Sequence, residues 1–239
     1  MKEKTYVEDV DRNMYDFRND EKDAYRIKNG LTEDIVEKIS EEKHDPEWMH
    51  DFRLNSLKIY HEMKVPDWGP SIEGLNMDNI ATYVRANTKM KGNWSEVPEE
   101  IKDTFEKLGI PQAERTSLAG VGAQYDSELV YHNVRKEVAE QGVIYTDMES
   151  ALNGEYADMV RKHFMKLVTP RDHKFAALHG AVWSGGSFVY VPPGVSVTIP
   201  LQSYFRLNAP GAGQFEHTLI IVDEVLCDGQ KVAMMAVEY

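Results

Sequence analysis

The stretch Val195-Ser-Val-Thr-Ile-Pro-Leu-Gln202 alternates aliphatic residues with Ser, Thr, Pro and Gln. A period of two is typical of a β-strand with one buried face. The stretch lies within Phe175–Val222, where only Arg206 and Glu216 carry formal charge, although 28% of the whole chain is charged. This contrast marks Phe175–Val222 as the buried part of the molecule. No helical pattern interrupts it, so we expect β-structure that begins late in the chain.

Turn residues divide this buried part into separate strands. Ser187–Val191 reads as a strand that ends at Pro192–Gly194, because proline fixes one backbone angle and glycine accepts turn conformations. Asn208–Gly213 is the next break, and Leu219–Val222 reads as a strand covered on both faces. The pattern predicts a sheet, a barrel or a solenoid, and it leaves these three open.

Composition limits the partners. The 239 residues allow one or two domains, and 27 Lys plus Arg against 40 Asp plus Glu give a net charge of −13. No basic run interleaved with aromatic residues is present that would follow a phosphate backbone. We therefore expect no nucleic-acid partner.

The sequence also predicts a location. Residues 1–9 lack the apolar core of a secretory signal, and their acidic residues argue against a transit peptide. No stretch approaches the roughly 20 consecutive apolar residues that span a bilayer. We expect a cytoplasmic protein with no membrane partner.

The chain divides into four parts. We expect a charged N-terminal arm at residues 1–30, a mainly helical region at 31–171, the β-structure at 172–224, and a C-terminal tail at 225–239. The fold class is therefore α+β.

Capping residues and apolar spacing place the helices of the second part. The helix starts are marked by Thr32, by Asp45 before Pro46, and by the capping box Thr146-Asp-Met-Glu149. Further helices are predicted over Pro98–Leu108 and Glu128–Gln141, each followed by a glycine that ends it.

The most testable catalytic hypothesis is a cupin-like metal enzyme that uses His179 and His217. Neutral imidazoles bind iron, manganese or zinc well. However, such a site needs a carboxylate that converges with both histidines, and in a regular strand Glu216 points away from its neighbour His217. A hydrogen-bonded structural role is the commoner one for a histidine in a strand.

Other catalytic motifs are incomplete. Ser184-Gly-Gly-Ser187 lacks the G-x-S-x-G nucleophile elbow, and Ala119-Gly-Val-Gly-Ala123 lacks the remaining residues of a phosphate loop. The single cysteine, Cys227, has no cationic neighbour that would lower its pKa. The residues therefore predict no enzyme, no catalytic or cofactor-binding residue and no metal site on this chain.

Ordered sequence blocks carry a resemblance to a known family. The chain resembles the SufB family of the SUF iron–sulfur cluster assembly system, over roughly residues 1–223. The blocks are Tyr6–Val10, Pro66–Pro70, Gly109–Arg115, Gly120–Asp126, Gly180–Phe188, Tyr190–Gly194, Pro200–Arg206 and Gln214–Leu219. The resemblance implies a helical N-terminal region followed by a right-handed parallel β-helix, of which 172–224 would be the first turns.

The resemblance also implies a function and partners. Members act as scaffolds on which a nascent iron–sulfur cluster is built, in a complex with the ATPase SufC and the paralogue SufD. Sulfur comes from a cysteine desulfurase through a carrier, and a reduced flavin is associated with the complex. The family's cluster-binding residues and SufC-binding segment lie beyond the matched part, so no site residue is carried over.

Residues 225–239 do not resemble the family, and Cys227 inherits no family role. One hypothesis is that the chain is truncated or frameshifted after about residue 224. In that case two functions compete. The chain is either a scaffold component or a non-catalytic fragment that only docks to partner subunits through its N-terminal helices. A short series of solenoid turns leaves an exposed apolar edge, so we expect self-association or poor solubility.

Overall fold

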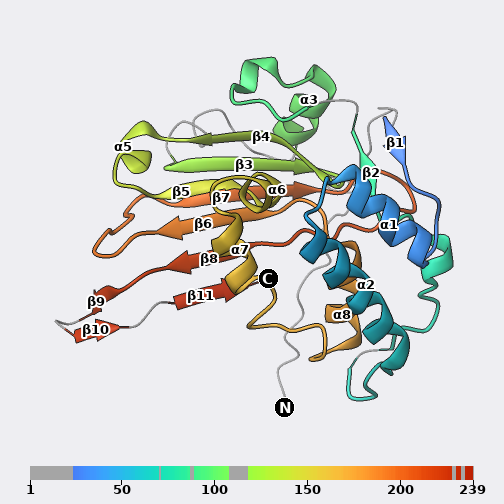
Figure 1. The fold of residues 1–239 in the computed structure, drawn as a ribbon. Helices are drawn as coiled ribbons and strands as arrows, with labels where there is room; N and C mark the ends of the chain where they lie inside the picture. The colour runs from blue at the N-terminus through green and yellow to red at the C-terminus, as the bar shows by residue number, and fades with distance from the viewer. Residues whose placement is uncertain are drawn as a thin grey trace, which may run out of the picture.

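The computed structural model describes residues 24–69, 71–86, 89–107, 118–227, 230–232 and 235–238. Within these ranges the protein is a mixed α+β fold (Figure 1). The helices are α1 (Glu33–Glu42), α2 (Glu47–Glu62), α3 (Glu99–Lys107), α5 (Lys136–Ala139), α6 (Met148–Asn153), α7 (Ala157–His163) and α8 (Lys174–Val182), with short 3-10 helices at Met77–Asn79 and Trp94–Glu96. The strands are β1 (Tyr25–Arg26), β2 (Val84–Arg85), β3 (Gly120–Tyr125), β4 (Glu128–Val134), β5 (Ile144–Asp147), β6 (Ser187–Val191), β7 (Leu201–Arg206), β8 (Leu219–Val222), β9 (Val225–Cys227), β10 (Gln230–Val232) and β11 (Met235–Glu238).

Two sheets form the body of the fold. One has the order β11-β8-β6-β5 and the other the order β4-β3-β7. Strands β6 and β8 are parallel, as are β3 and β7, whereas the remaining neighbours in these sheets are antiparallel. Between the parallel strands β6 and β8 the chain passes through β7 of the other sheet. The segment from β6 to β8 is therefore one coil that alternates between two sheets.

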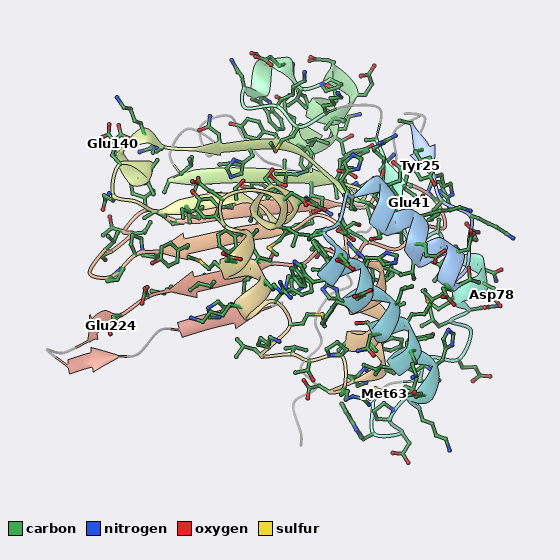
Figure 2. All side chains as sticks on the ribbon, viewed as in Figure 1. Tyr25, Glu41, Met63, Asp78, Glu140 and Glu224 are labelled. Carbon is green, nitrogen blue, oxygen red and sulfur yellow. The ribbon has the colours of Figure 1, made fainter. Side chains whose placement is uncertain are left out.

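Helices α1, α2 and α8 pack together at one side of the sheets (Figure 1). Ile35, Val36 and Ile39 are buried on one side of α1, as their helical spacing predicts. In Figure 2, Glu41 and Met63 mark this helical side, whereas Glu140 and Glu224 lie at the far ends of the sheets. No described helix is both long enough and apolar enough to cross a membrane.

The N-terminal helix boundaries need one correction. Thr32 is the N-cap of α1, but Pro46 and not Asp45 is the N-cap of α2. Asp45 does not cap the helix because its carboxylate binds the buried Arg53 guanidinium, with Oδ2 2.6 Å from Nε. A charge pair in the interior outweighs a cap at the surface.

The helix predicted over Glu128–Gln141 is wrong. This segment begins with β4, which pairs antiparallel with β3, and only the four residues of α5 are helical. Residues 128–134 include Val130, Tyr131 and Val134, which favour strands, and the β3–β4 connection positions them for pairing. The region 31–171 is thus less helical than its periodicity predicts, because β3, β4 and β5 also lie in it.

The buried stretch Phe175–Val222 needs two corrections. Its first eight residues belong to the helix α8, which is buried on most sides and so lacks the amphipathic pattern that identifies surface helices. The strand predicted from Val195 begins only at Leu201; Pro200, directly before it, has no N–H to donate to a neighbouring strand. The predicted alternation itself is confirmed, because residues 195, 197 and 199 are half-buried whereas 196, 198 and 200 are exposed.

The capping box at the start of α6 is shifted by one residue. Asp147 is the N-cap and accepts a hydrogen bond from the Ser150 N–H at 2.8 Å. Glu149, which the motif predicts to bond back to Thr146, accepts instead from the Gly185 N–H and pairs with Lys43.

Candidate functional site

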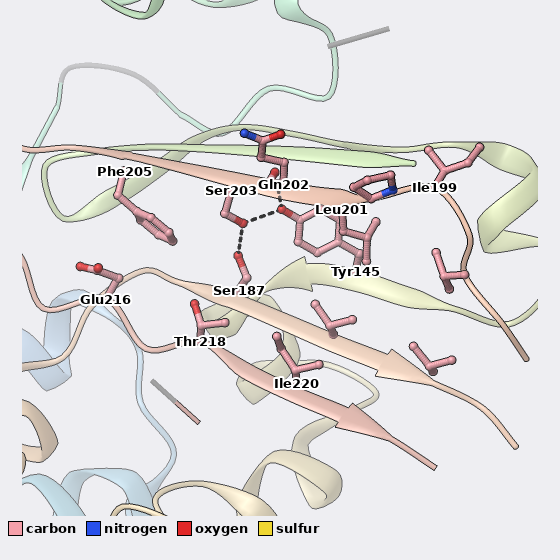
Figure 3. A pocket seen from close by; sticks show the side chains of 14 residues that line it. Tyr145, Ser187, Ile199, Leu201, Gln202, Ser203, Phe205, Glu216, Thr218 and Ile220 are labelled. Atoms are coloured by element: carbon pink, nitrogen blue, oxygen red, sulfur yellow. Dashed lines mark hydrogen bonds between the residues drawn. The ribbon is translucent and has the colours of Figure 1, made fainter. Parts of the chain in front are cut away.

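An apolar cleft of about 540 Å³ lies between the two sheets (Figure 3). The segment leading into β7 and β7 itself form one wall, through residues 197, 199–203 and 205, and β5, β6, β8 and the residues just before β8 form the other. The aliphatic lining residues are Val189, Val191, Val197, Ile199, Leu201 and Ile220. Three aliphatic residues of the period-two pattern, Val197, Ile199 and Leu201, therefore face this cleft.

Three hydroxyl groups meet at the floor of the cleft. Ser203 Oγ lies 2.6 Å from the Tyr145 hydroxyl and 2.8 Å from Ser187 Oγ, and the Tyr145 hydroxyl lies 3.0 Å from the Gln202 carbonyl oxygen. One direction of donation satisfies all three contacts: Ser187 donates to Ser203, Ser203 to Tyr145, and Tyr145 to the Gln202 carbonyl. Burial raises the pKa of Tyr145, so the group stays protonated and uncharged near neutral pH.

Glu216 is the one carboxylate among the residues that line the cleft, and it lies at the margin beside Phe205 (Figure 3). Burial raises its pKa above the ordinary value. The cleft thus offers an apolar surface, neutral hydroxyls and one carboxylate. These groups favour binding of apolar groups over bond-breaking chemistry.

The sequence singled out two histidines, and the structure brings them together. His179, on α8, is half-buried and His217, just before β8, is buried, with Nε2 of His179 2.8 Å from Nδ1 of His217. The cupin-like hypothesis also requires a carboxylate, and no group of three potential metal ligands occurs among the described side chains. The contact supports the structural role of a hydrogen-bonded pair.

The His179 site predicts a pH dependence of stability. Burial, followed by His217 and Arg53, lowers the pKa of His179 from 6.5 to about 3. Between pH 6.5 and about pH 3 the unfolded chain therefore binds a proton at this histidine and the folded chain does not. The free energy of unfolding is highest above pH 6.5 and falls as the pH decreases. From about pH 7.5 to about pH 5.8 we expect the free energy of unfolding to decrease by about 1 kcal/mol from this group.

Urea unfolding of the wild type and of His179→Gln at both pH values measures this effect. The lower pH is still above the isoelectric point of about 5.1. The variant should lose about 1 kcal/mol less than the wild type between the two pH values. Equal losses in both proteins would show that His179 is not the group responsible.

A buried polar network beside the cleft was not predicted from sequence. Lys43 Nζ lies 2.7 Å from Glu128 and 2.9 Å from Glu149, and its side chain is 4% exposed. Glu149 in turn accepts from the Gly185 N–H at 2.6 Å, and Gln124 accepts from the Gly186 N–H at 2.8 Å. The segment Ser184–Ser187, which lacks the nucleophile elbow, is therefore a junction from α8 into β6 that is held through the N–H groups of its two glycines.

Cys227 is the last residue of β9 and pairs with Gln230 of β10 in a hairpin. The tail beyond the hairpin returns as β11, which pairs antiparallel with β8. Ordered strands in the tail were not predicted. The proposed N-terminal arm lies outside the described residues except for its last seven, which include β1.

Comparison with known proteins identifies relatives over most of the chain. The family model described as SufBD protein N-terminal region matches residues 33–203. The iron–sulfur cluster assembly protein SufB of Bacillus subtilis strain 168 is 52% identical over 216 residues, which are 90% of this chain and 46% of that protein.

Two strains of Staphylococcus aureus, USA300 and NCTC 8325, have iron–sulfur cluster assembly SufBD family proteins with the same identity and coverage. The chain thus spans about half the length of the curated relatives it matches. The family model covers well over half of the chain, including α1, α2, the hairpin β3–β4 and the start of β7. The chain therefore belongs to the SufBD family.

Proposed function

We propose that this chain takes part in iron–sulfur cluster assembly, as the N-terminal part of a SufB-type scaffold and not as an enzyme. The observation that carries the proposal is the 52% identity to Bacillus subtilis SufB over 90% of the chain. The cleft is consistent with a structural role, since most of its lining residues are aliphatic, aromatic or proline. The cytoplasmic location predicted from the N-terminal sequence is part of this proposal.

We also propose that residues 187–222 are the first coil of a right-handed parallel β-helix. The parallel pair β6–β8 supports it, because a solenoid stacks equivalent strands of successive coils in parallel. The passage from β6 through β7 to β8 has the alternation between two sheets that a coil requires.

The proposed partners are a SufC-type ATPase and a SufD-type paralogue, with a cysteine desulfurase and its sulfur carrier acting indirectly. The iron–sulfur cluster is the cargo of this system. Since the described side chains contain no group of three potential metal ligands, the proposal assigns no cluster ligand to them. We propose that a reduced flavin associates with the whole complex, and we assign no residue of this chain to it.

A chimera tests the function. In Bacillus subtilis SufB, the 216 matched residues are replaced by those of this chain. We expect the chimera to co-purify with the SufC-type and SufD-type proteins and to restore cluster assembly in cells depleted of their own SufB. The reason is that 52% identity preserves a common fold and its surfaces.

The matched control is SufB with the same segment deleted, which should not restore assembly. This chain alone, reconstituted anaerobically with iron and sulfide, should retain no cluster absorption, with or without Cys227→Ser. A folded chimera that binds neither partner would contradict the proposal. Partner binding without restored assembly would favour the alternative of a segment that only docks to its partners.

A further inference from the structure

The connection between α7 and α8, residues 164–173, contains no strand (Figure 1). Its first residue, Phe164, belongs to one core cluster with Phe188 and Leu219. These side chains lie on the sheet face opposite to the cleft, because the cleft is lined instead by their neighbours in β6 and β8. The connection therefore packs on a face of the sheet, and not at a strand edge along which the proposed β-helix would continue.

Two apolar side chains of this connection are held in solvent. Leu167 is 56% exposed and Val168 is 45% exposed. Met165, before them, is 3% exposed, and Pro170, after them, is also buried. Because both flanking residues are anchored in the protein, the pair between them cannot turn inward. The pair is therefore a fixed apolar contact on the surface.

Three cations lie around this apolar pair. Lys162, Lys166 and Arg171 are exposed, and none of them forms an ion pair with another described residue. The dipole of α7 favours Lys162 at the end of that helix, but Lys166 and Arg171 lie beyond it. Asp172, the one carboxylate of the connection, accepts a hydrogen bond from the Thr169 N–H. In a chain with a net charge of −13, such a surface favours an acidic ligand.

We call this surface the α7–α8 patch; it consists of Lys162, Lys166, Leu167, Val168 and Arg171. A segment of matching chemistry occurs at residues 6–11, Tyr-Val-Glu-Asp-Val-Asp, which combine three apolar with three acidic side chains and no cation. Residues 1–23 lie outside the described part of the chain.

The described part of the chain begins at Ala24, and this position allows residues 6–11 to reach the patch. Val10 precedes Ala24 by 14 residues, and an extended chain of that length spans about 46–50 Å. A folded domain of this size is about 40–45 Å across. The chain between Val10 and Ala24 is therefore long enough.

We infer that residues 6–11 bind the α7–α8 patch of the same chain. Their apolar side chains cover Leu167 and Val168, and their carboxylates lie beside the three cations of the patch. Exposed ion pairs contribute little each, so a surface this small binds a separate molecule only weakly. A segment of the same chain needs far less affinity, because a short linker gives it an effective concentration of about 1 mM or more. This difference favours the chain's own segment over an acidic segment of another protein.

Disulfide cross-linking tests the position of the segment. In a Cys227→Ser background, Val10→Cys combined with Leu167→Cys should form a disulfide on mild oxidation, and the product should remain at 27.3 kDa. Met90→Cys replaces Leu167→Cys in the matched control, because Met90 is 48% exposed and does not belong to the patch. We expect Val10→Cys to cross-link about tenfold faster to residue 167 than to residue 90.

The control site is also the stricter one for chance encounters. The Ala24 N–H donates a hydrogen bond to the carbonyl of Arg85, which lies only five residues before Met90. Residue 90 is thus near the point where the N-terminal segment joins the described part of the chain. Random collisions would therefore modify residue 90 readily.

Charge reversal tests the basic part of the patch. Lys162→Glu with Lys166→Glu should slow the cross-link to residue 167 about two- to fivefold, the size expected for exposed ion pairs. Glu8→Lys with Asp9→Lys in the same protein should restore the rate, and high salt should remove the difference between the variants. A product of twice 27.3 kDa, equal rates at residues 167 and 90, or a charge reversal without effect would each overturn the inference.

Discussion

Replacing Gly186 by alanine is expected to lower the free energy of unfolding by about 3–5 kcal/mol, the sum of backbone strain and overpacking. Gly186 has φ of +97°, a region that residues with a Cβ rarely adopt. A Cβ at this position would lie 2.6 Å from the His217 backbone nitrogen and would overlap the His217 carbonyl. Because the obstruction is backbone, no change of rotamer relieves it.

Gly74→Ala is the matched control. Gly74 has nearly the same φ, +92°, but a Cβ there would meet no atom within 4 Å. It should cost about 1–2 kcal/mol, the strain of the left-handed region alone. Urea unfolding of both variants gives the difference. If Gly186→Ala cost no more than Gly74→Ala, the junction at Gly186 would be far looser than its contacts indicate.

The sequence predicted some elements of the fold and missed others, depending on whether a local pattern marks them. Helical spacing identified α1, because its buried residues recur at that spacing, whereas turn residues and a short apolar run identified β6 and β8. Periodicity misassigned α8, which is apolar on most sides and therefore carries no helical pattern. It also misassigned β4, where pairing with β3 decided the structure.

The candidate site was predictable only in part, for a related reason. The alternation of residues 195–202 identified one wall of the cleft. The next alternate position after Leu201 is Ser203, whose partner Tyr145 lies 58 positions earlier. Contacts such as Lys43 with Glu149 and His179 with His217 join separate elements. No local pattern encodes such pairs, whereas the resemblance to a family supplied the function from ordered blocks along the chain.

Arg53→Met should lower the free energy of unfolding by about 3–5 kcal/mol, which is the cost of leaving a buried charge without its partner. Arg53 and Asp45 are both fully buried, and Arg53 Nη1 also donates to the Trp183 carbonyl at 2.9 Å. The guanidinium lies 4.8 Å from the centre of the Trp183 ring. The pair therefore joins the start of α2 to the end of α8, and its loss should appear in a thermal or urea unfolding curve.

A double-mutant cycle with Asp45→Asn separates charge from packing. Asparagine keeps the shape of the aspartate and removes its charge, so the double variant contains no unpaired buried carboxylate. We expect Asp45→Asn to recover about 1–3 kcal/mol of the loss caused by Arg53→Met, the coupling typical of residues in one network. Additive losses would instead mean that Arg53 acts chiefly by packing on Trp183. In that case the ion pair would contribute little net stability, since desolvation would offset its attraction.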